Sequence, residues 1–443
     1  MNKEIKQRIE QLNNGKIPKG YQKTDFGVFP SDWETDKTLG DLFDFYGGLS
    51  KSRDELGEEG YAYLHYGDLH RGTFNSASID QYEQLPKCDI SLTGKEMCLM
   101  KDGDVAFLDA SEDLEGTSRA VLIDNPENKP FIAGLHIIYG KAKNNNLAKW
   151  FKQYITSSES VKKQFQRLAV GFKVYGVNRD TISRIKVAFP SSQKEQSRIA
   201  DILMKWDEAI ELYDKQIDAL TRYKAVCLKK MFPIKGQSVP EWRFHGFSGD
   251  WEQRKLGDIS SLITKGTTPK DKSGTGEVNF IKVENINDFS GDIVSMSKIS
   301  LEEHQGYLKR SQLQEGDILF SIAGTLGRVT SVNKAILPAN TNQALSIIRL
   351  KEGNLEYVKT CLKGNVVADF IRRNPTIGAQ PNLSLEQVSN LEIEIPSEAE
   401  QEKIGLYFSN LDNLITLHQR KKEVITNQRK TLQQYLLNGI IRV

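Results

Sequence analysis

Residues 195–231 read EQSRIADILMKWDEAIELYDKQIDALTRYKAVCLKKM, and their pattern gives the main evidence for the architecture. Apolar side chains recur in it with heptad spacing, in two interleaved series. The first series is Ile199, Trp206, Tyr213, Leu220 and Cys227, and the second is Leu203, Ile210, Ile217, Lys224 and Met231, with a lysine in its fourth place. Five heptads without glycine or proline predict one long helix that packs along another helix.

A second run with the same spacing, residues 400–436, supplies the partner helix. Its two series are Ile404, Leu411, His418, Ile425 and Leu432, and Phe408, Ile415, Lys422, Arg429 and Leu436. Each stripe could instead belong to a surface helix on its own domain, but the length of the pattern favours a two-helix coiled coil. Lys224, Lys422 and Arg429 interrupt the apolar seam. They either extend their charged ends out of it or mark a face that meets another protein.

The segments that precede the two helices repeat one another. Asp-Trp-Glu at residues 32–34 and Leu-Gly-Asp at 39–41 return at 250–252 and 256–258. A repeat of this length is a duplicated domain, and short β-branched runs predict mixed α/β segments in which strands predominate, with helices over 147–168 and 355–373. We divide the chain into an arm (1–25), a first mixed domain (26–190), a first long helix (191–234), a second mixed domain (235–397) and a second long helix (398–443).

The order of these segments predicts how the helices pair. The first helix leads from the first mixed domain into the second, and the second helix follows the second domain. The helices should therefore pair antiparallel, with a pseudo-twofold axis between the two halves. At about 1.5 Å per residue, each helix would be on the order of 55 to 60 Å long.

The bulk composition is that of an ordinary globular protein. The chain has 443 residues, a formal charge of +2 and four cysteines without paired spacing, which suggest neither a zinc knuckle nor a disulfide framework. No apolar run approaches the roughly 18 residues of a membrane span, and the charged N-terminus does not resemble a signal peptide. We expect a cytoplasmic protein. A near-neutral charge argues against coating nucleic acid but leaves local basic loops open.

Taken together, the repeated motifs resemble those of the specificity subunits of Type I restriction-modification systems. The shared features are the Asp-Trp-Glu entry, the Leu-Gly-Asp turn, a Gly-Asp strand at 103–104 and 316–317, and a Glu-Gln pair that opens each long helix. The second half follows the family closely at 266–270, 280–283, 340–344 and 380–384, and the first half departs from it at 47–51, 133–136 and 171–178. The resemblance implies two tandem target recognition domains that read two different half-sites, hence an asymmetric bipartite DNA target.

The resemblance also implies a subunit without catalytic residues of its own. Its partners would be double-stranded DNA, two modification (methyltransferase) subunits and two restriction/translocase subunits. S-adenosylmethionine, ATP and Mg would bind to those partners, and this chain itself would bind no cofactor or metal. The chain carries neither an Asn-Pro-Pro-Tyr motif nor a phosphate-binding loop. The alternatives are a stand-alone DNA-modifying enzyme and a coiled-coil scaffold that does not bind DNA.

Candidate DNA-contacting side chains lie in the glycine-rich segments of both mixed domains. Lysine and arginine read guanine in the major groove, and asparagine and glutamine read adenine. The candidates are Lys51, Arg53, Lys173, Tyr175 and Asn178 in the first domain and Thr267, Thr268, Lys270, Asn342, Gln343, Gln380 and Asn382 in the second. Each could touch a base, touch a phosphate or only shape a turn. Trp33 and Trp251 are interpreted as core anchors.

Overall fold

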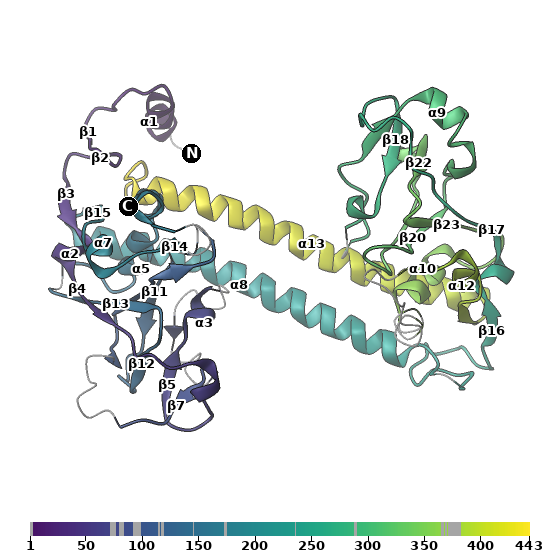
Figure 1. Ribbon diagram of the computed structural model, residues 1–443, viewed down its shortest axis with the longest axis horizontal. Helices are drawn as coiled ribbons and strands as arrows, with labels where there is room; N and C mark the ends of the chain where they lie inside the picture. Colours follow the sequence, from purple (N-terminus) through teal and green to yellow (C-terminus); the bar gives the residue numbers. More distant parts are fainter. Residues whose placement is uncertain are drawn as a thin grey trace. The chain divides into compact units, whose positions relative to one another are not determined.

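The computed structural model describes residues 3–70, 77–78, 84–91, 99–113, 116, 119–144, 146–171, 175–234, 236–287, 290–364, 367, 370 and 382–443. By its internal contacts the chain divides into two units. The first unit comprises residues 1–210 and 424–443, and the second comprises 211–423. Each unit contains one copy of the sequence repeat and a part of each long helix (Figure 1).

Two sheets form the centre of the first unit. The larger has the strand order β4 (Phe43–Gly47), β13 (Ile137–Ala142), β9 (Val105–Leu108), β11 (Ala120–Asp124) and β6 (Ala77–Ser78); the other has the order β7 (Lys87–Cys88), β5 (Tyr61–Leu64), β12 (Phe131–Ala133) and β8 (Leu99–Met100). Short antiparallel pairs join β1 (Tyr21–Lys23) to β2 (Val28–Pro30), β3 (Trp33–Thr38) to β15 (Lys186–Pro190) and β10 (Ala110–Ser111) to β14 (Tyr175–Gly176).

Helices cover one face of the larger sheet. The unit's helices are α1 (Lys3–Asn13), α2 (Leu39–Leu42), α3 (Tyr66–His70), α5 (Phe151–Thr156), α6 (Glu159–Leu168) and α7 (Arg179–Ser183). Phe107 of the sheet, Phe151 of α5 and Phe165 of α6 belong to one buried cluster. Ile199 and Leu436, from the two long helices, complete that cluster, so the domain and the helix pair share one core.

The second unit repeats this topology. One sheet has the order β17 (Ser260–Lys265), β23 (Leu345–Leu350), β20 (Ile318–Ser321) and β21 (Val329–Ser331), a second has the order β19 (Ser297–Ile299), β18 (Val278–Ile281) and β22 (Ala339–Thr341), and β16 (Glu252–Lys255) pairs with β24 (Glu392–Ile395). Its helices include α9 (Leu301–Gln305), α10 (Leu355–Lys363) and α12 (Leu385–Ser389). β18 and β22 are parallel, as are β5 and β12 in the first unit. The duplication is therefore one of fold as well as sequence.

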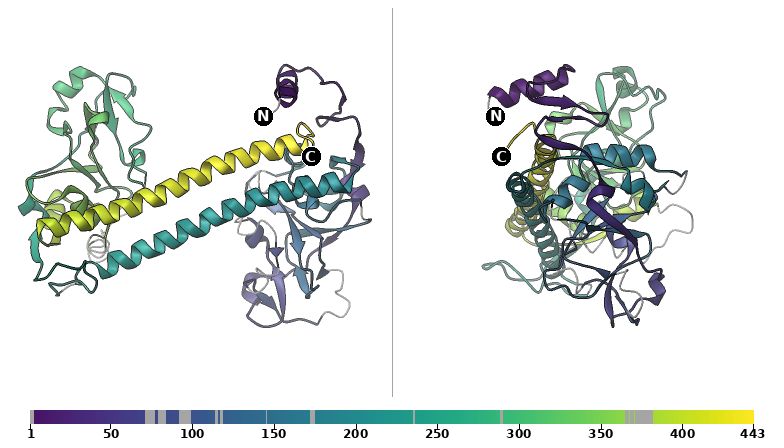
Figure 2. Two further views of the ribbon diagram at one scale, coloured as in Figure 1. Left: turned by 180° about the vertical axis from the view of Figure 1, so that it is seen from behind. Right: turned by 90° about the vertical axis from the view of Figure 1, so that its left-hand side faces the viewer.

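Both predicted long helices are present, as α8 (Gln193–Lys230) and α13 (Glu398–Leu437). In the first unit Asp207 of α8 binds Arg429 of α13, with 2.8 Å between Oδ1 and Nε. In the second unit Lys224 binds Asp412, and Asp214 binds Lys422. Residues later in α8 meet residues earlier in α13, so the pairing is antiparallel in each unit (Figure 2).

Each of the three charged seam residues has an acidic partner on the opposite helix. Lys224 binds Asp412, Lys422 binds Asp214 and Arg429 binds Asp207, so these charges tie the two helices together. Lys224 is 18% exposed, and its partner Asp412 also binds Lys363 of α10 at 3.1 Å. The heptad pattern located these residues but not their partners, because the aspartates lie outside the positions assigned to the seam.

The helices and strands of the domains differ from the prediction in their bounds. The helix expected over 147–168 is divided into α5 and α6, and the helix expected over 355–373 is described as α10 from Leu355 to Lys363. Helix α13 also contains a glycine, Gly405, near its start. A Cβ atom there would lie 2.7 Å from the backbone nitrogen of Tyr357, so the glycine lets α10 pack close to α13.

In each unit, an arginine that follows one long helix binds a glutamate in the first turn of the other long helix. Arg442 binds Glu195 at 2.5 Å and Asp32 at 2.9 Å, and Arg243 binds Glu400 at 2.7 Å. Beside these contacts, Trp33 and Trp251 are 4% and 3% exposed, which confirms them as core anchors.

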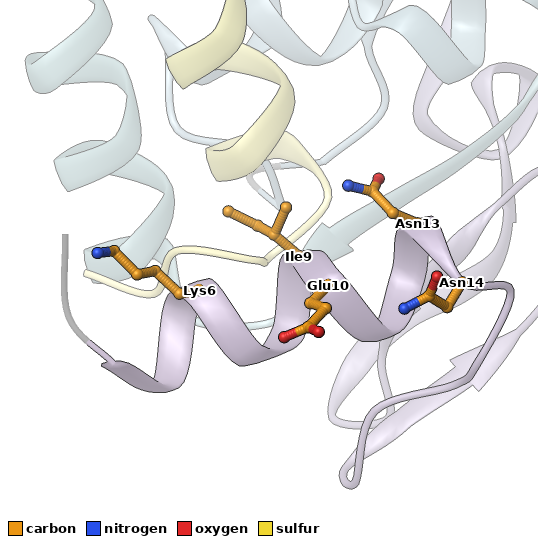
Figure 3. Close-up of a pocket in the computed structure, with 5 residues that line it drawn as sticks. All are labelled: Lys6, Ile9, Glu10, Asn13 and Asn14. Carbon is orange, nitrogen blue, oxygen red and sulfur yellow. The ribbon is translucent and has the colours of Figure 1, made fainter.

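The N-terminal helix α1 lies next to the last turns of α13. Arg8 donates from Nη1 to the carbonyl oxygen of Ile440 at 3.1 Å. Figure 3 shows Ile9 pointing toward the C-terminal segment, whereas Glu10 points away from it. A shallow depression beside Ile9 is also lined by Tyr435. The arm thus packs against the end of the chain in the first unit.

Candidate nucleic-acid interface

In the first unit, a glycine brings two strand-end loops together. Gly48 follows β4, and its backbone N–H donates to the carbonyl oxygen of Ile137 at 2.9 Å. The next residue, Leu49, donates to Ala133 at 2.7 Å. A Cβ atom on Gly48 would lie 1.9 Å from the carbonyl oxygen of Gly134, so any larger residue would force the two loops apart.

The second unit has the same junction. Gly266 follows β17 and donates to Leu345 at 3.2 Å, and Thr267 donates to Thr341 at 2.9 Å. A Cβ atom on Gly266 would lie 2.1 Å from the carbonyl oxygens of Thr341 and Asn342. The two glycines are therefore equivalent in the fold, and each places one candidate loop beside a second.

A third loop joins the junction in each unit. Asp109 donates its backbone N–H to His136 at 3.2 Å and accepts from Val177 at 2.8 Å. In the second unit Ile322 donates to Ala344 at 2.9 Å and accepts from Leu383 at 2.8 Å. Segments far apart in the sequence thus converge at the strand ends, which is the usual place for binding residues on a rigid scaffold.

In the first unit a buried tyrosine joins the converging loops. The hydroxyl of Tyr63 donates to the carbonyl oxygen of Leu49 at 2.6 Å. It also accepts the backbone N–H groups of Leu135 at 2.8 Å and Lys51 at 3.1 Å. Burial raises the pKa of this tyrosine, so the hydroxyl keeps its proton and can serve as donor and acceptor at once.

Two of the predicted contact residues already have acidic partners. Lys51 binds Glu55 at 2.7 Å, and this ion pair, with hydrogen bonds from Ser52, lowers the pKa of Glu55 to about 2. Arg53 binds Asp68 at 3.3 Å, with 54% of the Arg53 side chain exposed. Both cations are therefore held in place while remaining accessible to a ligand.

The candidates of the second unit form a connected polar group. Thr268 hydrogen-bonds Gln343, and Thr267 accepts a hydrogen bond from Nε of Arg310 at 3.1 Å. The ammonium group of Lys270 lies 4.7 Å from the ring centre of Tyr307. Thr268, Gln343 and Lys270 are exposed. This surface offers hydroxyl, amide and ammonium groups on backbone that the glycine junction holds.

The remaining candidates have separate places. Asn178 caps α7 by accepting the backbone N–H of Thr181 at 2.8 Å, as Ser384 caps α12. Asn382 is exposed and forms a β-bridge with Ala323, the counterpart of the pairing that Tyr175 and Gly176 make in β14. Asn342 accepts the backbone N–H of Ala344 at 3.2 Å. Lys173 and Gln380 lie outside the described residues.

Sequence reasoning missed several side chains at the junctions. His136 and Asp109 form a pair at 3.0 Å in the first unit, and Arg310 and Tyr307 border the second. None belongs to a spacing motif, so only the folded strand ends bring them beside the predicted residues. Among the described residues no group of three or more His, Cys, Asp and Glu side chains is arranged to hold a metal ion.

Comparison with known proteins assigns the chain to a family. The family model described as the Type I restriction modification DNA specificity domain matches residues 30–222 and 248–427. The chain belongs to this family. The resemblance read from the sequence is thereby confirmed, as is the interpretation that this is a recognition subunit rather than a catalytic one.

Curated relatives match either nearly the whole chain or about a third of it. The chain is 22% identical over 439 residues to the putative type I restriction enzyme MjaX specificity subunit of Methanocaldococcus jannaschii, covering 96% of this chain and 97% of the relative. It is 29% identical over 166 residues to the EcoBI specificity subunit of Escherichia coli, covering 35% and 33% of the two chains.

Solved structures share the fold of this specificity subunit. The S subunit of a Type I restriction-modification system from M. genitalium matches with a TM-score of 0.59 and 16% identity, covering 91% of this chain and 96% of the other. A chain from a structure of type I R-M complex assembly and conformational transition matches with a TM-score of 0.51 and 13% identity, covering 96% and 100%. The predicted fold, mixed domains with two long antiparallel helices, is confirmed.

No helix in the described ranges is long and apolar enough to cross a membrane.

Proposed function

We propose that this chain reads an asymmetric, bipartite DNA sequence, with one half-site for each mixed domain. The observation that carries the proposal is the paired glycine junction. Gly48 and Gly266 hold equivalent loops in equivalent ways, whereas the side chains on those loops differ. A shared frame with different hydrogen-bonding groups is what two different half-sites require, because base edges are distinguished by their donors and acceptors.

The chemistry of the loops fits DNA more closely than it fits a small molecule. Exposed groups include the guanidinium of Arg53, the ammonium of Lys270 and the amide of Gln343. Cationic groups suit phosphates and guanine, and carboxamides suit adenine. Lys51, Arg53, Lys173, Tyr175 and Asn178, with Thr267, Thr268, Lys270, Asn342, Gln343, Gln380 and Asn382, remain our proposed contact set.

The catalytic partners proposed for this subunit are proteins of the same restriction system. We infer two modification subunits and two restriction/translocase subunits, which would bind S-adenosylmethionine, ATP and Mg. One support is a set of exposed apolar side chains on the helices of the second unit. Leu212 and Tyr223 on α8 are 56% and 49% exposed, and Leu406 and Leu417 on α13 are 59% and 47% exposed.

The spacing of these side chains favours a protein interface. Within each pair the two residues are eleven positions apart, which is close to three helical turns, so they share one face of their helix. Exposed apolar stripes are typical of surfaces that other proteins cover. Leu417→Asp should reduce co-purification with the modification subunit at least tenfold. Leu301→Asp on α9, where Leu301 is 46% exposed, is the matched control and should have no effect.

A domain exchange tests the proposed function directly. Residues 26–190 would be replaced by the corresponding domain of another specificity subunit, and methylated adenines would be sequenced in cells that also carry the modification subunit. We expect only one half of the methylated sequence to change. A change in both halves, or in neither, would overturn the assignment of one half-site to each domain.

A further inference from the structure

The first unit has a histidine at the centre of its loop junction that the predicted contact set does not include. His136 follows Gly134 and Leu135, the loop that Gly48 and Tyr63 hold in place. Its side chain is 43% exposed. The equivalent position of the second unit is Ala344, since Asp109 and Ile322 donate to His136 and Ala344 through equivalent backbone bonds.

The backbone of His136 is in a conformation that side chains rarely adopt. Its φ is +61°, in the left-handed region that favours glycine. No positive φ occurs at Ala344, so the repeated frame does not by itself require this conformation. Non-glycine residues in this region concentrate at functional sites, where surrounding contacts hold them.

Two contacts hold the imidazole of His136. Nδ1 lies 3.0 Å from Oδ1 of Asp109, whose side chain is 30% exposed. The ring of Tyr66 meets it edge to face, with 5.5 Å between ring centres and an interplanar angle of 87°. A carboxylate at Nδ1 fixes the orientation of a histidine ring and leaves Nε2 for a further partner.

The surroundings of the pair suit a DNA base. Tyr66 is 37% exposed and lies 4.5 Å, centre to centre, from His65. His65 is buried and its Nδ1 accepts the N–H of Gly67 at 3.1 Å, so it supports Tyr66 rather than facing the ligand. Arg53 also lies near these rings, because a Cβ atom on Gly67 would be 3.3 Å from Nδ1 of His65 and 3.8 Å from Nη1 of Arg53. Cationic and aromatic groups around an oriented imidazole are a combination that accepts a nucleotide.

We propose that His136 contacts a base edge of the half-site read by the first domain, with Asp109 as its positioning residue. This inference rests on the proposed function and names a specificity-determining contact within it. The histidine–aspartate pair has no counterpart in the second domain, where Ala344 and Ile322 occupy the equivalent positions. The pair therefore contributes to making the two half-sites different.

The test uses the chain in complex with its modification subunit and selects bound duplexes from a random DNA pool. His136→Ala should reduce discrimination at one position of one half-site by about fivefold to tenfold, the size expected for one hydrogen bond to a base, and leave the other half-site unchanged. Asp109→Ala should relax the same position, and Asp109→Asn, which keeps an acceptor, should retain more of the discrimination. His245→Ala, at an exposed histidine outside the junction, is the control.

The outcomes separate this inference from the proposed function. If the unaltered complex selects no bipartite sequence, the proposed function fails. If it selects one and His136→Ala selects the same bases, the base contact fails. A weakening that is equal for all sequences would assign His136 to a phosphate and would also overturn the proposal. Melting temperatures equal to that of the unaltered chain exclude misfolding as the cause.

Discussion

Arg429 of α13 and Asp207 of α8 form a two-point ion pair in the helix seam of the first unit, with 2.8 Å between Nε and Oδ1 and 3.1 Å between Nη2 and Oδ2. Asp207 also accepts the hydroxyl of Tyr154 on α5 at 2.9 Å. One aspartate therefore connects the helix pair to the domain, and its two side chain partners come from elements far apart in sequence.

Removing one member of this group should cost more than an exposed ion pair would. Arg429→Ala leaves Asp207 without its cation in a half-buried position, and we expect a loss of about 1–3 kcal/mol in the free energy of unfolding. Arg429→Leu combined with Asp207→Leu should cost less than the sum of the single changes. Lys215→Ala, at an exposed pair with Glu211, should cost less than about 1 kcal/mol. Denaturant titration of each variant measures these losses. Equal losses for Arg429→Ala and Lys215→Ala would contradict the assignment.

The buried carboxyl group of Asp104, which precedes β9, should make the stability of the first unit depend on pH. Burial raises the pKa of Asp104 to about 6, so its charged form is unfavourable in the folded state. The contribution of Asp104 to stability should therefore become more favourable as pH falls from 7 through 6 toward 4. Asp104→Asn removes the penalty and should stabilise the chain by about 1–3 kcal/mol at pH 8 and by little at pH 4.

Asp317 is the matched control for Asp104. It occupies the same place in the second unit, but Arg349 binds both of its carboxylate oxygens, at 2.7 and 2.8 Å. Asp317→Asn should therefore destabilise the chain at pH 8. Thermal unfolding at pH 4, 6 and 8 compares the two variants. If Asp104→Asn destabilises the chain at pH 8, then neighbouring groups stabilise the charged form of Asp104 in the folded state and the prediction is wrong.

The two junction glycines should affect the half-sites separately. Gly48→Ala places a methyl group against the carbonyl of Gly134, and Gly266→Ala places one against Thr341. We expect at least a tenfold loss of discrimination in one half-site for each variant, and in different halves. Gly57→Ala, where a Cβ atom meets nothing within 4 Å, is the control. Selection from a random DNA pool measures the effect; loss in the same half for both would contradict separate readers.

The helix pair is expected to set the distance between the half-sites. Removing residues 207–213 and 423–429 takes seven residues from each helix. The ion pair between Asp214 and Lys422 is kept, so the remaining parts of the two helices stay in the same register. At 1.5 Å per residue this shortens each helix by about 10 Å, so the unread spacer should shorten by roughly three base pairs. Sequencing the methylated sites gives the spacer length. An unchanged spacer with retained methylation would show that another element sets it, and deletion in one helix alone should abolish binding.

Much of this architecture was predictable because it depends on local periodicity. The heptad series located α8 and α13 to within a few residues, and the Asp-Trp-Glu repeats placed Trp33 and Trp251 in the core. Short β-branched runs predicted mixed domains in which strands predominate, and both units contain such sheets. Each of these signals arises from neighbouring residues, so no knowledge of the fold was needed.

The seam charges and the loop junctions depended on tertiary structure. Lys224 could be seen to break the heptad pattern, but its pairing with Asp412 required the register of two helices nearly two hundred residues apart. His136 and Asp109 are unremarkable in sequence, and they form a pair because β13 and β9 end side by side. The chain alone determined the repeated frame, since periodicity is a local property. Only the packing of distant strands decided which side chains stand together on that frame, because those contacts depend on how strands far apart in the chain are paired.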